Sequence, residues 1–272
     1  MSIQQLYGGA KHRGAGGFSL VELMISIVAS IIVTGAAVAF TVSSLKANGD
    51  YVSSTRLIQD LRNSADFLSD DLRRAGYDQA AMVYVANPSA SAASVFAPIL
   101  VDTTAGANCV VYGYDRPNGT PGAVDLVRGE VRAARRASPP VNGVATGVIE
   151  VAESFRTGAG TDVRPVCGAP GPDYNQYPVT CNTTTGWCPL TDPRILDVSV
   201  FTVATAASGT NSHGLQPISG GSGFNAMQLR EYLLTVTGNL KKDTTVSRTV
   251  RSNIKVRADC IRADLANCVV SP

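Results

Sequence analysis

The N-terminal part of the chain contains a long run without a charged side chain, residues 23–45. This run is longer than the roughly 20 residues with which a helix crosses a hydrocarbon core of about 30 Å. Lys11 and Arg13 precede it, and the positive-inside rule keeps such residues on the cytoplasmic side. The sequence therefore predicts one membrane-spanning helix, with everything after Lys46 on the opposite, periplasmic side.

The helical pattern continues beyond the uncharged run. Between Lys46 and Ala75, apolar residues recur at steps of three and four, with charged residues between them. The first proline is Pro88. We expect one continuous helix over residues 18–75, on the order of 85 Å long, stopped by Gly76. Its second half should bury one stripe against a domain, formed by Leu57, Leu61, Leu68 and Leu72.

The rest of the chain predicts an α+β fold. After the helix the composition shifts to Gly, Pro, Ser, Thr and Val, and runs rich in β-branched or aromatic residues are bounded by turn residues. We expect an antiparallel sheet packed against the apolar stripe of the helix. The predicted strands are 94–101, 109–114, 123–131, 148–152, 195–202, 229–237 and 245–256. Residues 157–192 and 208–223 are expected to form loop-rich insertions that carry a specific contact surface.

All six cysteines follow the uncharged run. An even number on that side favours disulfides in an oxidising compartment, and no pair has the C-x2-C spacing of a structural zinc site. We expect local pairs Cys181–Cys188 and Cys260–Cys268, which leaves Cys109 with Cys167. The alternative is that some of these thiols are free and buried.

Few residues indicate catalysis. His213 is the only histidine after the first 17 residues and lies in a Gly/Ser-rich segment, and Gly220-Gly221-Ser222-Gly223 lacks the Lys-Ser/Thr of a phosphate loop. Asp70 and Asp71 are expected to be solvated beside Arg73 and Arg74. We therefore expect no enzymatic activity and no catalytic, cofactor or metal site.

The charge balance argues against a nucleic-acid partner. The chain has 23 Lys+Arg against 21 Asp+Glu, with basic residues only in short scattered pairs such as Arg135-Arg136. Nucleic-acid binding needs a basic face or stripe. We expect none here.

Glu22 interrupts the apolar start of the helix. A carboxylate at this place is costly unless it reaches water or finds a partner charge. One interpretation is that Glu22 marks the membrane edge and reaches the headgroups. The other is that it pairs with a charge from another molecule.

The stretch Gly16-Gly17-Phe18-Ser19-Leu20-Val21-Glu22-Leu23-Met24 resembles the class III signal of type IV pilins and type II secretion pseudopilins. The resemblance implies that a prepilin peptidase cuts between Gly17 and Phe18 and methylates the new N-terminus. In that family the acid five residues into the mature chain is the assembly residue, here Glu22. Its carboxylate would neutralise the Phe18 ammonium of an adjacent subunit within an apolar helix bundle.

A second stretch narrows the resemblance. Residues 66–77, DFLSDDLRRAGY, are similar to the helix-end signature of the PilW minor pilins and, more weakly, to that of the GspJ pseudopilin; residues 246–256 resemble the final strand of this group. Ala39 stands where many major pilins have a helix-kinking proline. The resemblance implies a minor pilin that initiates or caps a filament and supports pilus biogenesis, twitching or adhesion.

The resemblance also implies partners, location and parts. The partners would be other minor and major pilins through the N-terminal helix, the prepilin peptidase and a tip adhesin. The location would be the bacterial inner membrane and then the filament or its tip. We expect a leader (1–17), a transmembrane and assembly half of the helix (18–45), an amphipathic half (46–76) and a periplasmic head (77–272). The alternatives are a GspJ-like type II secretion pseudopilin and a membrane-tethered periplasmic enzyme or receptor.

Overall fold

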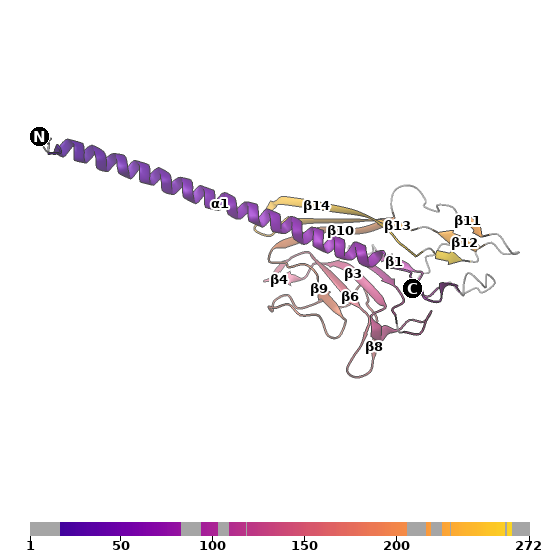
Figure 1. Cartoon of the computed structure of the whole chain (residues 1–272). Helices are drawn as coiled ribbons and strands as arrows, with labels where there is room; N and C mark the ends of the chain where they lie inside the picture. The colour runs from indigo at the N-terminus through magenta and orange to yellow at the C-terminus, as the bar shows by residue number, and fades with distance from the viewer. Residues whose placement is uncertain are drawn as a thin grey trace, which may run out of the picture. The chain divides into compact units, whose positions relative to one another are not determined.

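The computed structural model describes residues 17–82, 94–102, 109–117, 119–205, 216–218, 225–228, 230–258 and 260–262. The chain divides into two compact units, Met1–Val52 and Ser53–Pro272. One helix, α1 (Leu20–Leu72), contributes to both units, and the described strands all belong to the second unit (Figure 1). The structure confirms the predicted α+β layout, a long apolar N-terminal helix followed by an antiparallel β domain.

The end of α1 lies slightly before the predicted position. The helix ends at Leu72, and residues 73–76 form a turn in which Gly76 adopts a left-handed φ of +79°. The N–H of Gly76 donates to the carbonyl of Gly113, at 2.7 Å. Gly76 therefore closes the turn that follows the helix, not the helix itself, and it directs the chain toward the first sheet.

The first main sheet is antiparallel and has the strand order β1-β2-β3-β6-β9. Its strands are β1 (Ile99–Asp102), β2 (Cys109–Gly113), β3 (Val131–Ala137), β6 (Val148–Glu153) and β9 (Trp187–Pro189). The predicted strand 123–131 is wrong, because most of it forms a turn and the short 3-10 helix η2 (Leu126–Arg128). Asp125 caps this helix by accepting from the N–H of Val127, and Gly129 closes it at a φ of 67°. Strands β3 and β9 were not predicted from the sequence.

The second main sheet is a separate antiparallel unit with the order β10-β13-β14. Its strands, β10 (Leu196–Thr205), β13 (Glu231–Leu240) and β14 (Asp243–Lys255), overlap the last three predicted strands. The expectation of one sheet is therefore corrected to two main sheets. Where they meet, the N–H of Val198 donates to the carbonyl of Gly147 at 2.8 Å, and a Cβ on Gly147 would lie 1.9 Å from the carbonyl oxygen of Val198.

Three small sheets complete the described part of the head. They are β11 (Gln216–Ile218), β12 (Asn225–Gln228) and β15 (Cys260–Arg262) in the order β11-β12-β15, and the two-stranded pairs β4 (Pro140–Val141) with β5 (Val144–Ala145) and β7 (Phe155–Arg156) with β8 (Asp162–Val163).

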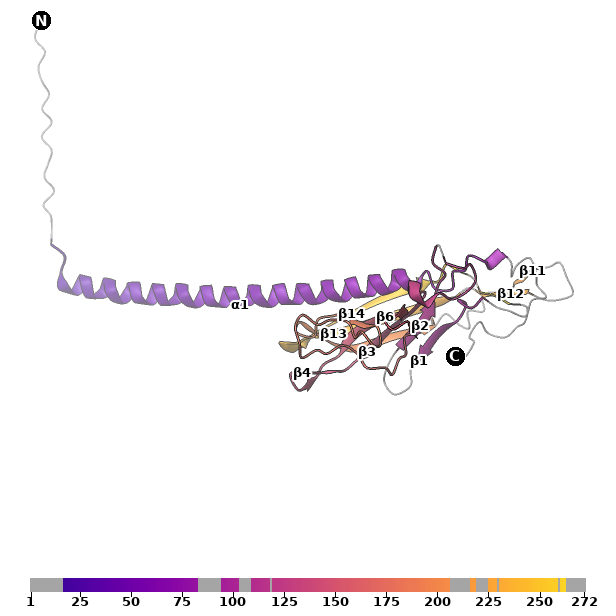
Figure 2. The same ribbon diagram turned by 90° about the horizontal axis from the view of Figure 1, so that it is seen from below.

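The core of the second unit lies between the C-terminal part of α1 and both main sheets (Figure 2). The predicted helix stripe is buried as expected, and Ala65 belongs to it. It packs against residues of the first sheet, among them Val110 and Ile149, and against residues of the second sheet, among them Val198 and Leu234. Because the same stripe of α1 packs against both sheets, the amphipathic part of the helix joins them in one hydrophobic core.

Candidate functional site

The proposed cleavage point lies just before α1. Gly16 falls outside the described residues, whereas Gly17 and Phe18 precede the first turn, and the Phe18 side chain is 80% exposed. A Cβ added to Gly17 would meet no atom within 4 Å. The packing of the chain itself therefore does not require glycine at this position, as expected if the requirement comes from an external protein such as a peptidase.

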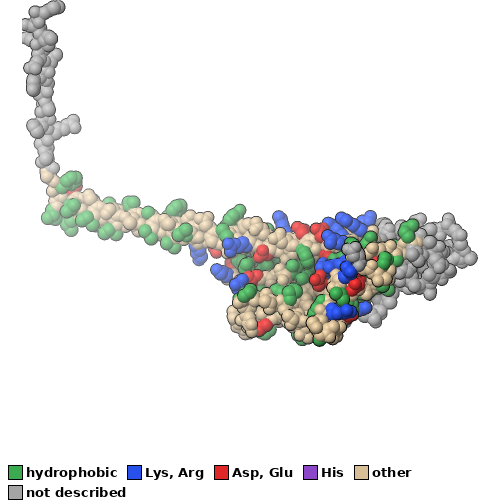
Figure 3. Space-filling view, turned by 60° about the horizontal axis from the view of Figure 1, so that its bottom comes forward, with side chains coloured by type: hydrophobic (Ala, Val, Ile, Leu, Met, Phe, Trp, Pro, Cys, Tyr) green, Lys and Arg blue, Asp and Glu red, His purple; other side chains and the backbone are tan. Residues whose placement is uncertain are grey.

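The N-terminal part of α1 presents apolar side chains on all sides. Its most apolar 18-residue window has a mean hydropathy of 2.4 and no buried residue, which makes it long and apolar enough to cross a membrane. Figure 3 shows these side chains along the helix. They include Leu20, Leu23, Ile25, Ile31, Phe40 and Leu45, all more than half exposed. Such a surface is unfavourable in water and requires lipid or other helices around it.

Several hydroxyl groups of this segment form hydrogen bonds within the helix. The hydroxyls of Ser26, Thr34 and Thr41 each donate to the carbonyl four residues earlier, at 2.7 to 2.8 Å. These bonds remove the cost of placing a hydroxyl in an apolar environment. Glu22 differs, because its carboxylate has no hydrogen-bond or ion-pair partner among the described residues. An apolar bundle that buried this carboxylate would therefore have to supply a partner from outside the described residues.

A buried carboxylate connects the C-terminal end of α1 to the first sheet. Asp71 is only 6% exposed; Tyr112 and Tyr114 donate their hydroxyls to its two oxygens, the latter at 3.1 Å. A guanidinium nitrogen of Arg132 lies 2.7 Å from the same carboxylate. The prediction that Asp71 is solvated is therefore wrong, whereas Asp70 is exposed and pairs with Arg73 at 2.8 Å. Asp71 is buried because it lies three residues after Leu68 and seven after Ser64, on the buried face of the helix.

Two side chains of the Asp71 cluster, defined as Asp71, Tyr112, Tyr114 and Arg132, have raised pKa values. Burial and the nearby charge of Asp71 raise the pKa of Tyr112 well above its usual value. Although burial alone would lower it, the charge and hydrogen bond of Asp71 raise the pKa of Arg132. Around neutral pH the Arg132 guanidinium is charged and the Tyr112 phenol is neutral, so these two side chains hold the Asp71 carboxylate as an ion-pair partner and a hydrogen-bond donor.

A second buried ion pair fastens the loop-rich segment 157–192 to the first sheet. The guanidinium of Arg135 bonds to Glu150 at 2.7 and 2.8 Å, and it donates to the carbonyl of Ala169 at 2.6 Å. It also lies 4.0 Å from the ring centroid of Trp187, and Tyr174 donates to Glu150 at 3.1 Å. Arg135, which the sequence presents as half of a scattered basic pair, is thus a core residue.

Two predicted disulfides are present. Cys109 bonds to Cys167 and Cys181 bonds to Cys188, so these four cysteines are paired and not free. Cys260 lies in β15, while Cys268 falls outside the described residues, as do His213 and residues 220–223. Among the described residues, no group of three or more His, Cys, Asp or Glu is placed to hold a metal ion.

An exposed apolar helical segment that continues into the core helix of an antiparallel β domain fits the membrane anchor and head of a pilin-like protein. The family model described as prepilin peptidase-dependent protein B matches residues 50–256, which is more than half of the chain. The chain belongs to this family. No curated protein and no solved structure matches it.

Proposed function

We propose that this protein is a minor type IV pilin of the PilW kind that helps to initiate or cap pilus assembly. It is cut by prepilin peptidase between Gly17 and Phe18, methylated on Phe18 and held in the inner membrane with its head in the periplasm. Its role is structural, with no catalytic centre. The observation that carries this proposal is Glu22, a carboxylate without a partner among the described residues, at the start of an exposed apolar helix.

The proposed mechanism depends on charge pairing between subunits. Removal of the leader gives Phe18 an ammonium group, and packing of the apolar helices removes both this group and Glu22 from water. Each buried charge is unfavourable alone, but a pair between neighbouring subunits compensates both and sets the register of the bundle. Pilin-like subunits with the same N-terminal arrangement would therefore be its partners, together with the prepilin peptidase and, at a tip, an adhesin.

The test is the substitution Glu22→Ala. It leaves the ammonium of the adjacent subunit unpaired at about 3 to 5 kcal/mol, more than about a hundredfold in the equilibrium of incorporation. We expect the protein to enter the membrane normally but to be lost from sheared filaments or their priming complex, as measured by immunoblotting. Asp50→Ala is the matched control, since Asp50 is an exposed carboxylate of the same helix beyond the uncharged run.

A type II secretion pseudopilin is the second candidate, because the 66–77 motif is shared in weaker form with GspJ. The filament that contains the protein separates the two functions. Loss of pili when the gene is deleted would support the minor pilin. Intact pili together with exoproteins that stay inside the cell would support the secretion pseudopilin. Unchanged incorporation of the Glu22→Ala variant would instead favour a membrane-tethered enzyme or receptor.

A further inference from the structure

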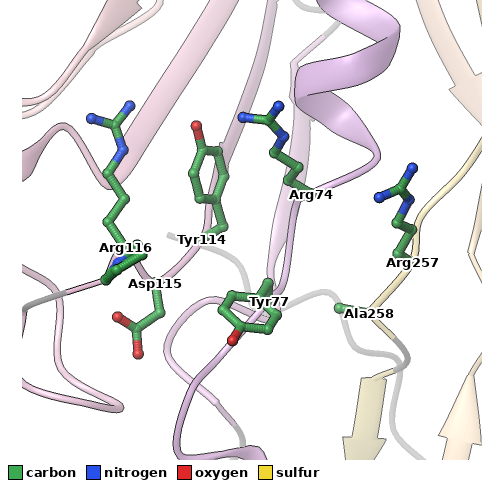
Figure 4. Close-up of a pocket in the computed structure, with 8 residues that line it drawn as sticks. Arg74, Tyr77, Tyr114, Asp115, Arg116, Arg257 and Ala258 are labelled. Carbon is green, nitrogen blue, oxygen red and sulfur yellow. The ribbon is translucent and has the colours of Figure 1, made fainter.

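A cavity of about 330 Å³ lies in the head beyond the end of α1. Its walls come from three chain segments that follow α1, β2 and β14, and each segment contributes one arginine: Arg74, Arg116 and Arg257. Figure 4 shows Arg74 and Arg116 on either side of Tyr114, with Arg257 beyond Arg74. Three guanidinium groups therefore line one small space.

Asp115, the acidic group of the cavity, forms no ion pair with these arginines. Asp115 is 2% exposed, and its oxygens accept from the backbone N–H and side-chain amide of Gln79, at 3.1 and 2.8 Å, and from the N–H of Gly122 at 3.1 Å. These neutral donors stabilise its charge in place. Asp115 thus belongs to the turn that shapes the wall.

The three arginines differ in the hydrogen bonds and ion pairs that their guanidinium groups form within the head. Arg116 donates to the carbonyl of Arg128 at 2.6 Å and lies 3.5 Å from Glu153. Arg74 and Arg257 are exposed, and within the described residues neither guanidinium has a hydrogen-bond or ion-pair partner. Within the part of the chain that the structure describes, the cavity therefore carries two arginines without an ion-pair partner.

The remaining lining suits a protein ligand. Tyr77 is 51% exposed, and Pro117 and Ala258 add apolar surface. Tyrosine and arginine together are the residues most enriched at the energetic centres of protein interfaces, and a space of this size holds a few side chains rather than a whole element. Guanidinium groups also match the planar geometry of a carboxylate.

We propose that this cavity binds an acidic side chain, Asp or Glu, presented by the head of a neighbouring pilin subunit. This inference rests on the proposed function, since it assumes a neighbour in the filament or its priming complex. The apolar helix would hold subunits together within the membrane or filament core, and the cavity would select which head lies beside this one.

The experiment places the photo-crosslinker p-benzoylphenylalanine at Tyr77 in the full-length protein in its native cells. We expect a crosslink to another pilin that falls more than about tenfold in the double variant Arg74→Glu, Arg257→Glu, because two charge-assisted contacts are lost. The variant Arg74→Lys, Arg257→Lys should retain part of the signal. The matched control is Arg248→Glu, Arg251→Glu on the exposed part of β14, which should leave the crosslink unchanged. Protease resistance of the head confirms that each variant is folded.

The outcomes separate the cavity from the proposed function. A crosslink unaffected by charge reversal, a crosslink only to lipid, or no crosslink at all would overturn the cavity proposal. A charge-dependent crosslink to a protein that is not a pilin would keep the acidic ligand but contradict the pilin neighbour. The Glu22→Ala experiment does not involve the cavity, so its failure would contradict the proposed function and with it the pilin neighbour, but it would leave the charge-dependent crosslink as a separate test of the acidic ligand.

Discussion

The buried carboxylate of Asp71 shows how a single residue fixes the end of α1 against the first sheet. Its three partners come from β2, β3 and the residue after β2, so the helix cannot rotate or slide without breaking several bonds at once. Buried charges that keep their partners are tolerated, whereas loss of one partner is expensive.

Tyr112→Phe tests this cluster. At pH 7 we expect a loss of about 1 to 3 kcal/mol in the free energy of unfolding, because Asp71 loses a buried donor. Urea unfolding of the purified protein measures it. Tyr77→Phe, which changes an exposed phenol, should have little effect, and equal stability of the two variants would contradict the assignment.

The same variant predicts a change in pH dependence. The folded-state pKa of Tyr112 is raised, so above the usual tyrosine pKa of about 10 the unfolded chain loses a proton that the folded protein retains. Stability must fall as the pH rises through this range. The fall should be less steep in Tyr112→Phe but not absent, because burial and Glu150 also raise the pKa of Tyr174.

Arg135→Ala tests the second buried pair. It leaves the Glu150 carboxylate buried with Tyr174 alone, and we expect a loss of about 3 to 5 kcal/mol. Arg73→Ala removes an exposed pair and should cost at most about 1 kcal/mol. Similar losses for both substitutions in urea unfolding would show that Arg135 contributes no more than a surface residue.

At the scale of elements, the sequence predicts the helices and strands whose characteristic residue pattern lies within a single segment. The 3.6-residue pattern of α1 and the β-branched runs of β10, β13 and β14 are visible in single segments. Strand β3, in contrast, reads VRAARRA, which has no hydrophobic alternation. Arg135 can be buried there only because Glu150, Trp187 and two carbonyls surround it, and these contacts are distant in the sequence. The burial of Asp71 could not be predicted for the same reason, because its partners on β2 and β3 are also distant in the sequence.

The two disulfide bonds are expected to stabilise the folded protein by different amounts, because they close loops of different length. In the chain-entropy model the Cys109–Cys167 bond, with a separation of 58 residues, stabilises by about 4 kcal/mol, and Cys181–Cys188, with a separation of 7, by about 2 kcal/mol. Paired Cys→Ala variants, compared by urea unfolding without reductant, should follow this order. The opposite order would mean that native contacts, rather than loop closure, dominate both bonds.

At the scale of the whole molecule, two independent stretches of sequence lead to one class of protein. The residues around the proposed cleavage point resemble the pilin-type signal, and the family model matches residues 50–256, which lie outside that stretch. The Asp71 cluster and the arginine cavity could not be predicted, because each joins segments brought together only by the fold.

The central claim is that the chain is a processed pilin-like subunit, and the N-terminus of the native protein tests it most directly. Mass spectrometry of the protein purified from its own membranes should find a chain that begins at Phe18 and carries one methyl group. The Gly17→Arg variant should instead keep residues 1–17. A native protein that begins at Met1, or normal processing of the Gly17→Arg variant, would contradict the account.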